Sequence, residues 1–163
     1  MESVFNLFKI GDNVFYPLHG VGVIENIETH NVLGKETRYY ILRFSNGRMT
    51  AMVPVDTAEE VGLRYVMTAE EYERIMEYLE NTEGESDYGN WNQRYRENMD
   101  KLKSGDIFAM ADVVLSLKKR ETEKGGLSSG EKKMLITART TLLAELMCAS
   151  GRPEEDFTAV LGK

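Results

Sequence analysis

The segment from position 90 to 96 carries the residues best suited to contact a nucleic acid. Asn90 is a suitable helix N-cap, because its side chain can accept a hydrogen bond from the free N–H of Gln93, which can reach back in a capping box. This arrangement places Trp91, the only tryptophan of the chain, on the first helical turn. Arg94 and Arg96 follow within five residues. An aromatic ring beside arginines at a helix start is typical of a contact with nucleic acid.

The same residues allow a second interpretation. Trp91, Tyr95 and Met99 recur at spacings of four residues, which is the pattern of the inner stripe of an amphipathic helix. Buried stripes of this kind are much commoner in proteins than rings that contact bases. The spacing alone leaves both interpretations of Trp91 open.

A second group of basic residues lies at the start of another predicted helix. Ser128 and Glu131 have the spacing of a capping box, with Ser128 as the N-cap and Glu131 at N3. Lys132 and Lys133 follow in the first turn, where the helix dipole disfavours cations. A phosphate backbone would compensate for this through Coulomb attraction and counterion release. By contrast, the basic run at 118–120 lies near a helix C-terminus, where capping explains it as well as a phosphate contact does.

No group of residues indicates catalysis or metal binding. His19 and His30 have no cysteine partner at the spacing of metal ligands. The glycine-rich loops that bind phosphates do not occur, and no pair of carboxylates lies in an apolar setting that would raise a pKa. We therefore expect no catalytic residues, no metal and no cofactor.

The composition is that of a globular protein with an uneven charge distribution. Hydrophobic residues make up 42% and charged residues 29% of the 163 positions, without an apolar run of the roughly 18 residues that a membrane span needs. No signal peptide is visible, so we expect a cytoplasmic protein without membrane contact. The net charge of −7 divides into −2 for residues 1–66, −7 for residues 67–90 and +2 for residues 91–163.

The first third of the chain has the pattern of a small antiparallel β-barrel of the SH3 or Tudor type. Short alternating runs are separated by turn signals, of which Asn46-Gly47 is the strongest for a hairpin. Pro54 ends the fourth run and favours an edge strand, which another protein can extend by strand pairing. Met49 and Met52 would offer adaptable apolar contacts there or fill the barrel. The predicted strands lie within residues 8–16 and at 21–29, 38–44 and 49–53.

The rest of the chain is predicted to be helical, which makes the fold α+β. Thr68 begins an acidic helix that ends near position 81, and residues 82–89 have the composition of a linker. We therefore divide the chain into residues 1–66, an acidic helix and linker at 67–89, and a compact helical domain at 90–163. Cys148, the only cysteine, is expected in the core of this domain. The predicted helices of this domain are 92–103, 106–124 with Gly125 at C′, one that ends at Gly151, and a short helix that begins at Pro153.

Several motifs resemble the CarD/CdnL family of bacterial transcription regulators, in order over nearly the whole chain. The N-terminal motif is also similar to the polymerase-interacting domain of transcription-repair coupling factors, but the C-terminal motif and Asn90-Trp91 distinguish the two. A coupling factor would also need helicase domains. The motifs are Phe8-Lys9-Ile10-Gly11-Asp12, Tyr16-Pro17-Leu18-His19-Gly20-Val21-Gly22, Val53-Pro54, Asn90-Trp91, Arg94-Tyr95, Lys103-Ser104-Gly105-Asp106 and Leu127-Ser128-Ser129-Gly130-Glu131-Lys132-Lys133-Met134-Leu135.

The resemblance implies a Tudor-like domain that binds the β-subunit lobe of RNA polymerase, partly by strand pairing. It also implies a helical domain that contacts promoter DNA at the upstream edge of the transcription bubble and stabilises the open complex. The family tryptophan corresponds to Trp91, an apolar wedge in the minor groove. DNA contact would be independent of sequence, and the chain would act as a monomer on polymerase in the nucleoid. The implied DNA-binding residues are Asn90, Trp91, Arg94, Arg96, Lys132 and Lys133.

Two positions depart from the family pattern. Arginines that help to hold the polymerase in characterised members correspond to His30 and Met52 here, so the polar contacts must differ. Arg48 is a candidate substitute. The alternative function is a protein–protein adaptor that uses the barrel edge without DNA contact. The predicted polymerase-binding residues are His30, Arg48, Met49, Thr50, Ala51, Met52 and Pro54.

Overall fold

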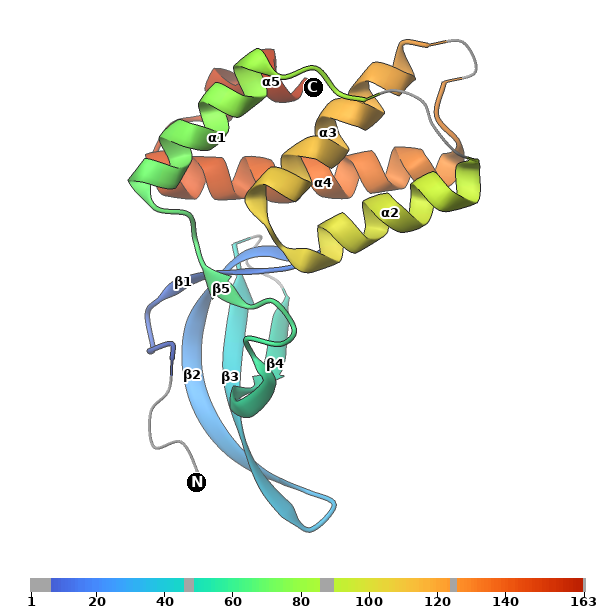
Figure 1. Ribbon diagram of the computed structural model, residues 1–163. Helices are drawn as coiled ribbons and strands as arrows, with labels where there is room; N and C mark the ends of the chain where they lie inside the picture. Colours follow the sequence, from blue (N-terminus) through green and yellow to red (C-terminus); the bar gives the residue numbers. More distant parts are fainter. Residues whose placement is uncertain (1–6, 46–48, 86–89, 124–125, 163) are drawn as a thin grey trace. The chain divides into compact units, whose positions relative to one another are not determined.

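The chain forms two compact units, one β-rich and one helical (Figure 1). In a computed structural model, residues 7–45, 49–85, 90–123 and 126–162 are described. Unit 1 comprises Met1–Val66 and unit 2 comprises Met67–Lys163. The predicted α+β class is therefore confirmed. None of the helices in the described ranges is long and apolar enough to cross a membrane.

Unit 1 is a five-stranded antiparallel sheet with the order β4-β3-β2-β1-β5. The sheet is not closed, because β4 and β5 form its two edges, so it is Tudor-like without being a complete barrel. The predicted Asn46-Gly47 turn lies outside the described residues. The strands are β1 (Asn13–Tyr16), β2 (Gly20–Val32), β3 (Lys35–Phe44), β4 (Thr50–Pro54) and β5 (Arg64–Tyr65), with a 3-10 turn, η1 (Val55–Thr57), after β4.

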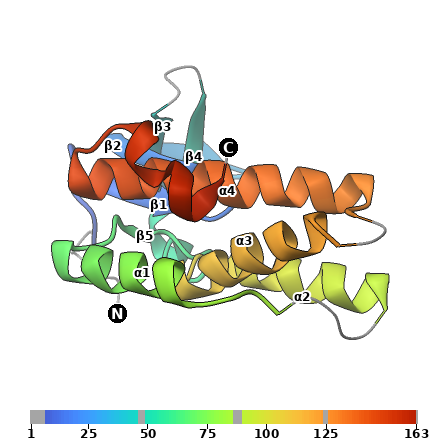
Figure 2. The ribbon, with the colours of Figure 1, turned by 90° about the horizontal axis from the view of Figure 1, so that it is seen from above.

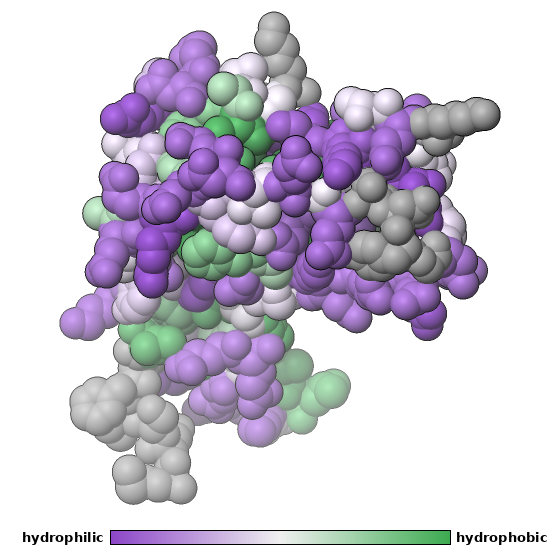
Figure 3. All heavy atoms as spheres, turned by 45° about the horizontal axis from the view of Figure 1, so that its top comes forward, coloured by the Kyte–Doolittle hydropathy of each residue, from purple (hydrophilic) through white to green (hydrophobic). Residues whose placement is uncertain are grey.

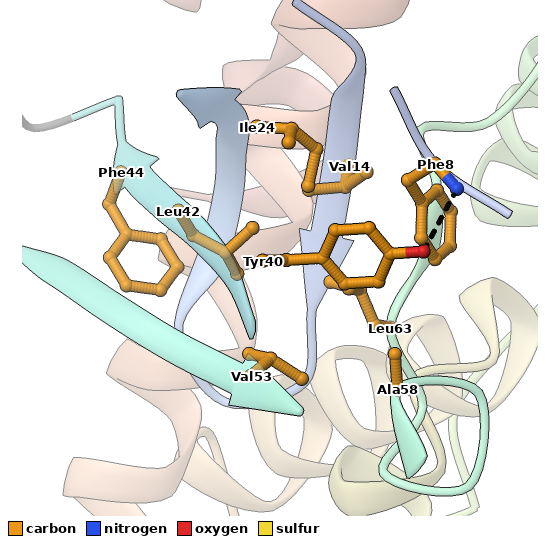
Figure 4. Packing of buried hydrophobic residues seen from close by; sticks show 9 residues of the cluster. All are labelled: Phe8, Val14, Ile24, Tyr40, Leu42, Phe44, Val53, Ala58 and Leu63. Atoms are coloured by element: carbon orange, nitrogen blue, oxygen red, sulfur yellow. Dashed lines mark hydrogen bonds between the residues drawn. The ribbon is translucent and has the colours of Figure 1, made fainter. Parts of the chain in front are cut away.

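The core of unit 1 lies on one face of the sheet, where alternate residues of β3 point inward (Figure 4). Tyr40 has 1% of its surface exposed, and its hydroxyl accepts a hydrogen bond from the N–H of Phe8 at 3.2 Å. The two rings meet edge to face with centroids 5.4 Å apart. The opposite face of β3, which includes Ile41 and Arg43, therefore remains available for contacts. The buried cluster consists of Phe8, Val14, Ile24, Tyr40, Leu42, Phe44, Val53, Ala58 and Leu63.

The hairpin between β2 and β3 is longer than the sequence predicts. Its strands pair as far as Val32 and Lys35, and the turn consists of Leu33 and Gly34. Both turn residues have positive φ, +53° and +81°, as a type I′ turn requires. Leucine is an unusual residue in this conformation, and the Leu33 side chain is fully exposed.

Replacing Leu33 with asparagine is expected to stabilise unit 1. The left-handed conformation costs an ordinary residue about 1–2 kcal/mol, and asparagine tolerates it better. We expect the free energy of unfolding in urea to rise by about 1 kcal/mol. Val32→Asn is the control, since Val32 is exposed in the neighbouring strand and lacks positive φ. If neither variant has a higher free energy of unfolding than the original protein, the turn is not strained.

Unit 2 is a helical bundle in which α2, α3 and α4 pack on one another and α1 packs on α3 and α4 (Figures 1 and 2). The apolar residues on the inward sides of α3 and α4 are buried, including Met110, Val114 and Leu142. Its surface in Figure 3 is mostly hydrophilic. The helices are α1 (Ala69–Asn81), α2 (Trp91–Ser104), α3 (Ile107–Glu121), α4 (Ser129–Ser150) and α5 (Thr158–Leu161), with a 3-10 turn, η2 (Glu154–Phe157), before α5.

Helix ends follow the sequence closely, with some corrections. Thr68 forms the predicted capping box with Glu71, and Gly151 ends α4 with φ of +72°. A short helical segment follows Pro153 as predicted, but Pro153 is its N-cap rather than its first residue. The prediction that Cys148 lies in the core is wrong, because its side chain is exposed. The C′ position proposed for Gly125 lies outside the described residues.

The acidic helix α1 belongs to unit 2 rather than to a separate segment. Tyr78 on α1 donates a hydrogen bond to the carboxylate of Asp112 on α3. This bond, with burial, raises the pKa of Tyr78 to about 12. The tyrosine therefore stays protonated at neutral pH and can donate this bond, which ties α1 to the bundle.

The segment after α1 packs closely on α3, although its composition is that of a linker. At Gly84, an added Cβ atom would lie 2.3 Å from the backbone carbonyl of Leu115. Only glycine therefore fits at this position without a shift of the backbone.

Gly84→Ala is therefore expected to destabilise unit 2. Overpacking of this kind costs about 1–3 kcal/mol, which urea unfolding would detect as a lower transition midpoint. Glu83→Ala is the control, because the Glu83 side chain is 93% exposed and lies 3.9 Å from Lys119 in a surface ion pair. If both variants unfold at the midpoint of the original protein, the segment does not pack on α3 as described.

Candidate nucleic-acid and polymerase interfaces

Trp91 is the first residue of α2 and lies at the surface of unit 2. Asn90 caps the helix as predicted, since its side chain accepts a hydrogen bond from the N–H of Gln93 at 2.8 Å. The reciprocal half of the capping box does not form, and the amide nitrogen of the Gln93 side chain donates to Glu97. The indole is 42% exposed. Trp91 is therefore not part of a buried stripe, and Leu102 is the one buried residue of α2.

The indole lies against the start of α4, at the end of unit 2 where α2 and α4 both begin (Figures 1 and 2). Its Nε1–H donates a hydrogen bond to the hydroxyl of Ser128 at 2.8 Å. Its ring stacks on Tyr95, with centroids 5.2 Å apart and planes inclined by 24°. Gly130 lies beside this pair, since an added Cβ would lie a tight 3.3 Å from Tyr95 and in ordinary contact, 3.7 Å, with Trp91. The ring is thus ordered by contacts and still partly open to solvent.

Lys132 and Lys133 follow Ser128, the hydrogen-bond partner of this ring, by four and five residues and are exposed on α4. The capping box of Ser128 and Glu131 is confirmed, with both hydrogen bonds at 3.2 Å. The lysines are the fourth and fifth residues of the helix, so they follow the first turn rather than lie in it. The helix dipole opposes them less than we expected, because its effect falls off within the first turn. An exposed aromatic ring and two cations nevertheless occur at one end of unit 2.

The two arginines of α2 differ in their surroundings. Arg96 is exposed, whereas the Arg94 side chain is 13% exposed and its Nε lies 3.7 Å from the carboxylate of Glu131. Nε of Arg120 on α3 lies 3.9 Å from the same carboxylate oxygen. Arg94 is therefore placed to join helices, and its proposed DNA contact remains a prediction.

Sequence reasoning missed this cluster of Arg94, Arg120 and Glu131. Glu131 is 1% exposed, and burial of a carboxylate is favourable only when charged and hydrogen-bonding groups surround it. The capping box predicted its contact with Ser128 but not the approach of two arginines from other helices. The basic run at 118–120 could have suggested the approach of Arg120. Lys118 of that run does not join the cluster but donates to the carbonyl of Val160 at 3.1 Å. Among the described residues no group of His, Cys, Asp and Glu could hold a metal ion.

The predicted polymerase-binding surface lies on β4, which is an edge strand as its proline indicated. Ala51 and Val53 point toward the core, whereas Thr50 and Met52 are exposed. Met49, just before the strand, is 55% exposed and Met52 is 50% exposed, so neither methionine fills the barrel. The free backbone edge of β4 is thus accompanied by adaptable apolar side chains.

His30 lies near the far end of β2, on the same face of the sheet as Tyr39 and Pro54. Its ring meets Tyr39 edge to face with centroids 5.8 Å apart. Tyr39 is in turn directly opposite Pro54 in the β3–β4 register. The His30 ring also lies 2.9 Å from the carboxylate of Glu28, which lowers the pKa of that carboxyl group. Arg48, the suggested substitute for the family arginines, lies outside the described residues.

Comparison with known proteins decides the family. The family model described as CarD-like/TRCF RID domain matches residues 8–67, and the model described as CarD, C-terminal domain, matches residues 74–162. This chain belongs to the CarD/CdnL family. A Bacillus subtilis (strain 168) protein named "Putative transcription factor YdeB" is 39% identical over 152 residues, which cover 93% of this chain and 97% of that protein.

Membership of the CarD/CdnL family confirms the resemblance noted in the sequence and identifies the chain as a transcription regulator. The N-terminal match is to a domain type that interacts with RNA polymerase. The match ends at residue 67, one residue beyond the end of unit 1. The C-terminal match begins within α1 and includes Trp91, Ser128 and both lysines.

Proposed function

We propose that this CarD/CdnL protein binds the β-subunit lobe of RNA polymerase through unit 1 and promoter DNA through unit 2. Trp91 would act as an apolar wedge in the minor groove at the upstream edge of the transcription bubble. The observation that carries the proposal is the exposed indole, held at the start of α4, the helix that carries the exposed Lys132 and Lys133. The net effect would be a longer-lived open complex.

On the polymerase side, the supporting feature is the edge strand β4. Its outer backbone groups are free to pair with a strand of the β lobe, as in other complexes formed by strand addition. Met52 and the Tyr39–His30 pair flank that edge on the outward face of the sheet. Contacts from these residues would replace the polar contacts that the family arginines make.

On the DNA side, the supporting feature is the exposed apolar surface of the indole. The indole would not have to melt the duplex itself. Wedges of this kind lose a few kcal/mol of base stacking in return for protein contact, and here the polymerase has already separated the strands. A factor shifts an equilibrium only by its difference in affinity for the two states. An indole that contacts only the melted junction provides such a difference and requires no hydrolysis.

Lys132 and Lys133 would contact phosphates, so their reversal should change the salt dependence of DNA binding. We expect Lys132→Glu/Lys133→Glu to weaken DNA binding by the polymerase-bound protein at low salt. The slope of log affinity against log salt should become shallower by about two, one for each phosphate that a lysine no longer neutralises. The measurement is a salt titration of open-complex stabilisation.

Lys101→Glu/Lys103→Glu provides a matched control, because these lysines lie at the opposite end of α2. Its salt dependence should resemble that of the original protein. If the two double variants behave alike, only the net charge of unit 2 matters and the proposed phosphate contact is wrong.

The alternative function is an adaptor that uses β4 and makes no DNA contact. Open-complex lifetimes distinguish the two functions, because an adaptor is indifferent to the side chain at Trp91. Polymerase binding, measured in the same samples, should not depend on Trp91 under either function. A lifetime unchanged by Trp91→Ala would favour the adaptor.

A further inference from the structure

The orientation of the Trp91 ring is determined by a hydrogen bond to the N-cap of α4 in addition to stacking on Tyr95 of its own helix. Trp91 is the first residue of α2, and a half-exposed side chain at that position has few neighbours within the helix. A freely rotating indole would lose this freedom on entering the groove, which weakens binding. The contacts that prevent this rotation therefore influence how well the wedge works.

One edge of the indole faces α4, and the other does not. Nε1 bonds to Ser128, and Cζ2, on the same edge of the ring, is the indole atom closest to a Cβ placed on Gly130. One ring face stacks on Tyr95. The opposite edge is thereby turned away from α4.

Ser128 is itself held firmly, which makes it an effective hydrogen-bond acceptor. Its hydroxyl accepts from the N–H of Glu131 and its own N–H donates to the Glu131 carboxylate, both at 3.2 Å. That carboxylate is buried and lies within 4 Å of Arg94 and Arg120, on α2 and α3. The hydroxyl is thus fixed relative to all three long helices of unit 2.

We infer that Ser128 is a positioning residue for the DNA wedge: its hydroxyl holds the Trp91 indole in the orientation that enters the groove. The inference rests on the proposed function of Trp91. It adds that the N-cap of α4 serves two purposes, since one oxygen both caps the helix and orients the ring. Glu131 acts one step further back by fixing Ser128.

The intrinsic fluorescence of the free protein tests this inference directly, because Trp91 is the only tryptophan. In Ser128→Ala the fluorescence anisotropy of Trp91 should fall, and the open-complex lifetime should shorten by about three- to tenfold, the range expected for ordering one side chain on binding. Ser128→Thr, which keeps the hydroxyl, should restore both values.

Two further variants separate orientation from folding. Thr68→Ala removes the cap of α1 in the same kind of capping box without touching Trp91, so it should change neither value. Trp91→Phe keeps a stacking ring and the Ser128 cap but loses the N–H donor. It should shorten the lifetime about as much as Ser128→Ala, and the double variant should show no further reduction.

The inference would be overturned if the Trp91 anisotropy of Ser128→Ala equalled that of Thr68→Ala. It would also be overturned if Trp91→Phe kept the open-complex lifetime of the original protein. The anisotropy measurement involves neither polymerase nor DNA, so it is independent of the proposed function. If anisotropy falls in Ser128→Ala but Trp91→Ala does not shorten the open-complex lifetime, the positioning contact is real and the wedge function is wrong.

Discussion

Trp91→Ala should shorten the lifetime of the polymerase open complex by about tenfold relative to the original protein, which corresponds to about 1.4 kcal/mol. The reason is that alanine offers no apolar surface to the edge of the bubble, so the protein no longer distinguishes open from closed DNA. The measurement is the decay of promoter complexes after addition of a competitor. Binding of the variant to polymerase should be unchanged, because β4 is on unit 1.

Ile136→Ala is the matched control for this substitution. Ile136 is an apolar side chain on α4 with 61% of its surface exposed, and it is two turns beyond Ser128. We expect its open complexes to decay at the original rate. If the Ile136 variant shortens the lifetime as much as the Trp91 variant, general surface hydrophobicity rather than a wedge explains the effect.

Glu131→Ala should lower the free energy of unfolding of unit 2 by about 3–5 kcal/mol. The carboxylate is buried beside Arg94 and Arg120, and it also caps the N–H of Ser128. Removing it leaves two guanidinium groups in a site that is mostly shielded from water. Urea unfolding followed by far-UV circular dichroism would report the loss of helix.

Glu97→Ala controls for the general effect of removing a carboxylate from unit 2. Glu97 is exposed on α2 and accepts one hydrogen bond from Gln93, so its removal should change the unfolding free energy by no more than about 0.5 kcal/mol. Equal stability of the Glu131 and Glu97 variants would contradict the structural role given to the buried carboxylate.

Local signals in the sequence predicted the helix starts well. Thr68, Asn90 and Ser128 all cap helices as expected, because a cap depends on residues three positions apart. The capping box predicted at Gln93 forms only in part, and the amide nitrogen of Gln93 donates instead to Glu97, one turn further on.

Features that depend on tertiary packing could not be read from the sequence. The segment that contains Gly84 has the composition of a linker. Only the close approach of Gly84 to the backbone of Leu115 shows that the segment is packed. The buried position of Glu131 depends on arginines that are more than ten residues away along the chain, on two other helices. The apolar composition of the helix around Cys148 suggested that this residue is buried, but its side chain is exposed.

In unit 1 the alternation of residues predicted the strands but not their full length. At the far end of the β2–β3 hairpin both faces of the sheet are exposed. The residues there are therefore mostly polar and do not alternate with apolar ones, so the sequence did not indicate a strand. The edge position of β4 was correctly predicted from Pro54, since proline cannot donate a hydrogen bond to a neighbouring strand. The edge strand that we propose to bind polymerase was therefore predictable from a single proline. The cluster of Arg94, Arg120 and Glu131 was not predictable in this way.

Site-specific photo-crosslinking from position 91 tests the central proposal most directly. Trp91 would be replaced by p-benzoylphenylalanine, with the same replacement at Ile136 as a control, and each protein irradiated in open complexes. We predict cross-links from position 91 to promoter DNA at the upstream edge of the bubble, and none to DNA from position 136. Cross-links from position 91 to polymerase alone, or to DNA equally from both positions, would contradict the proposal.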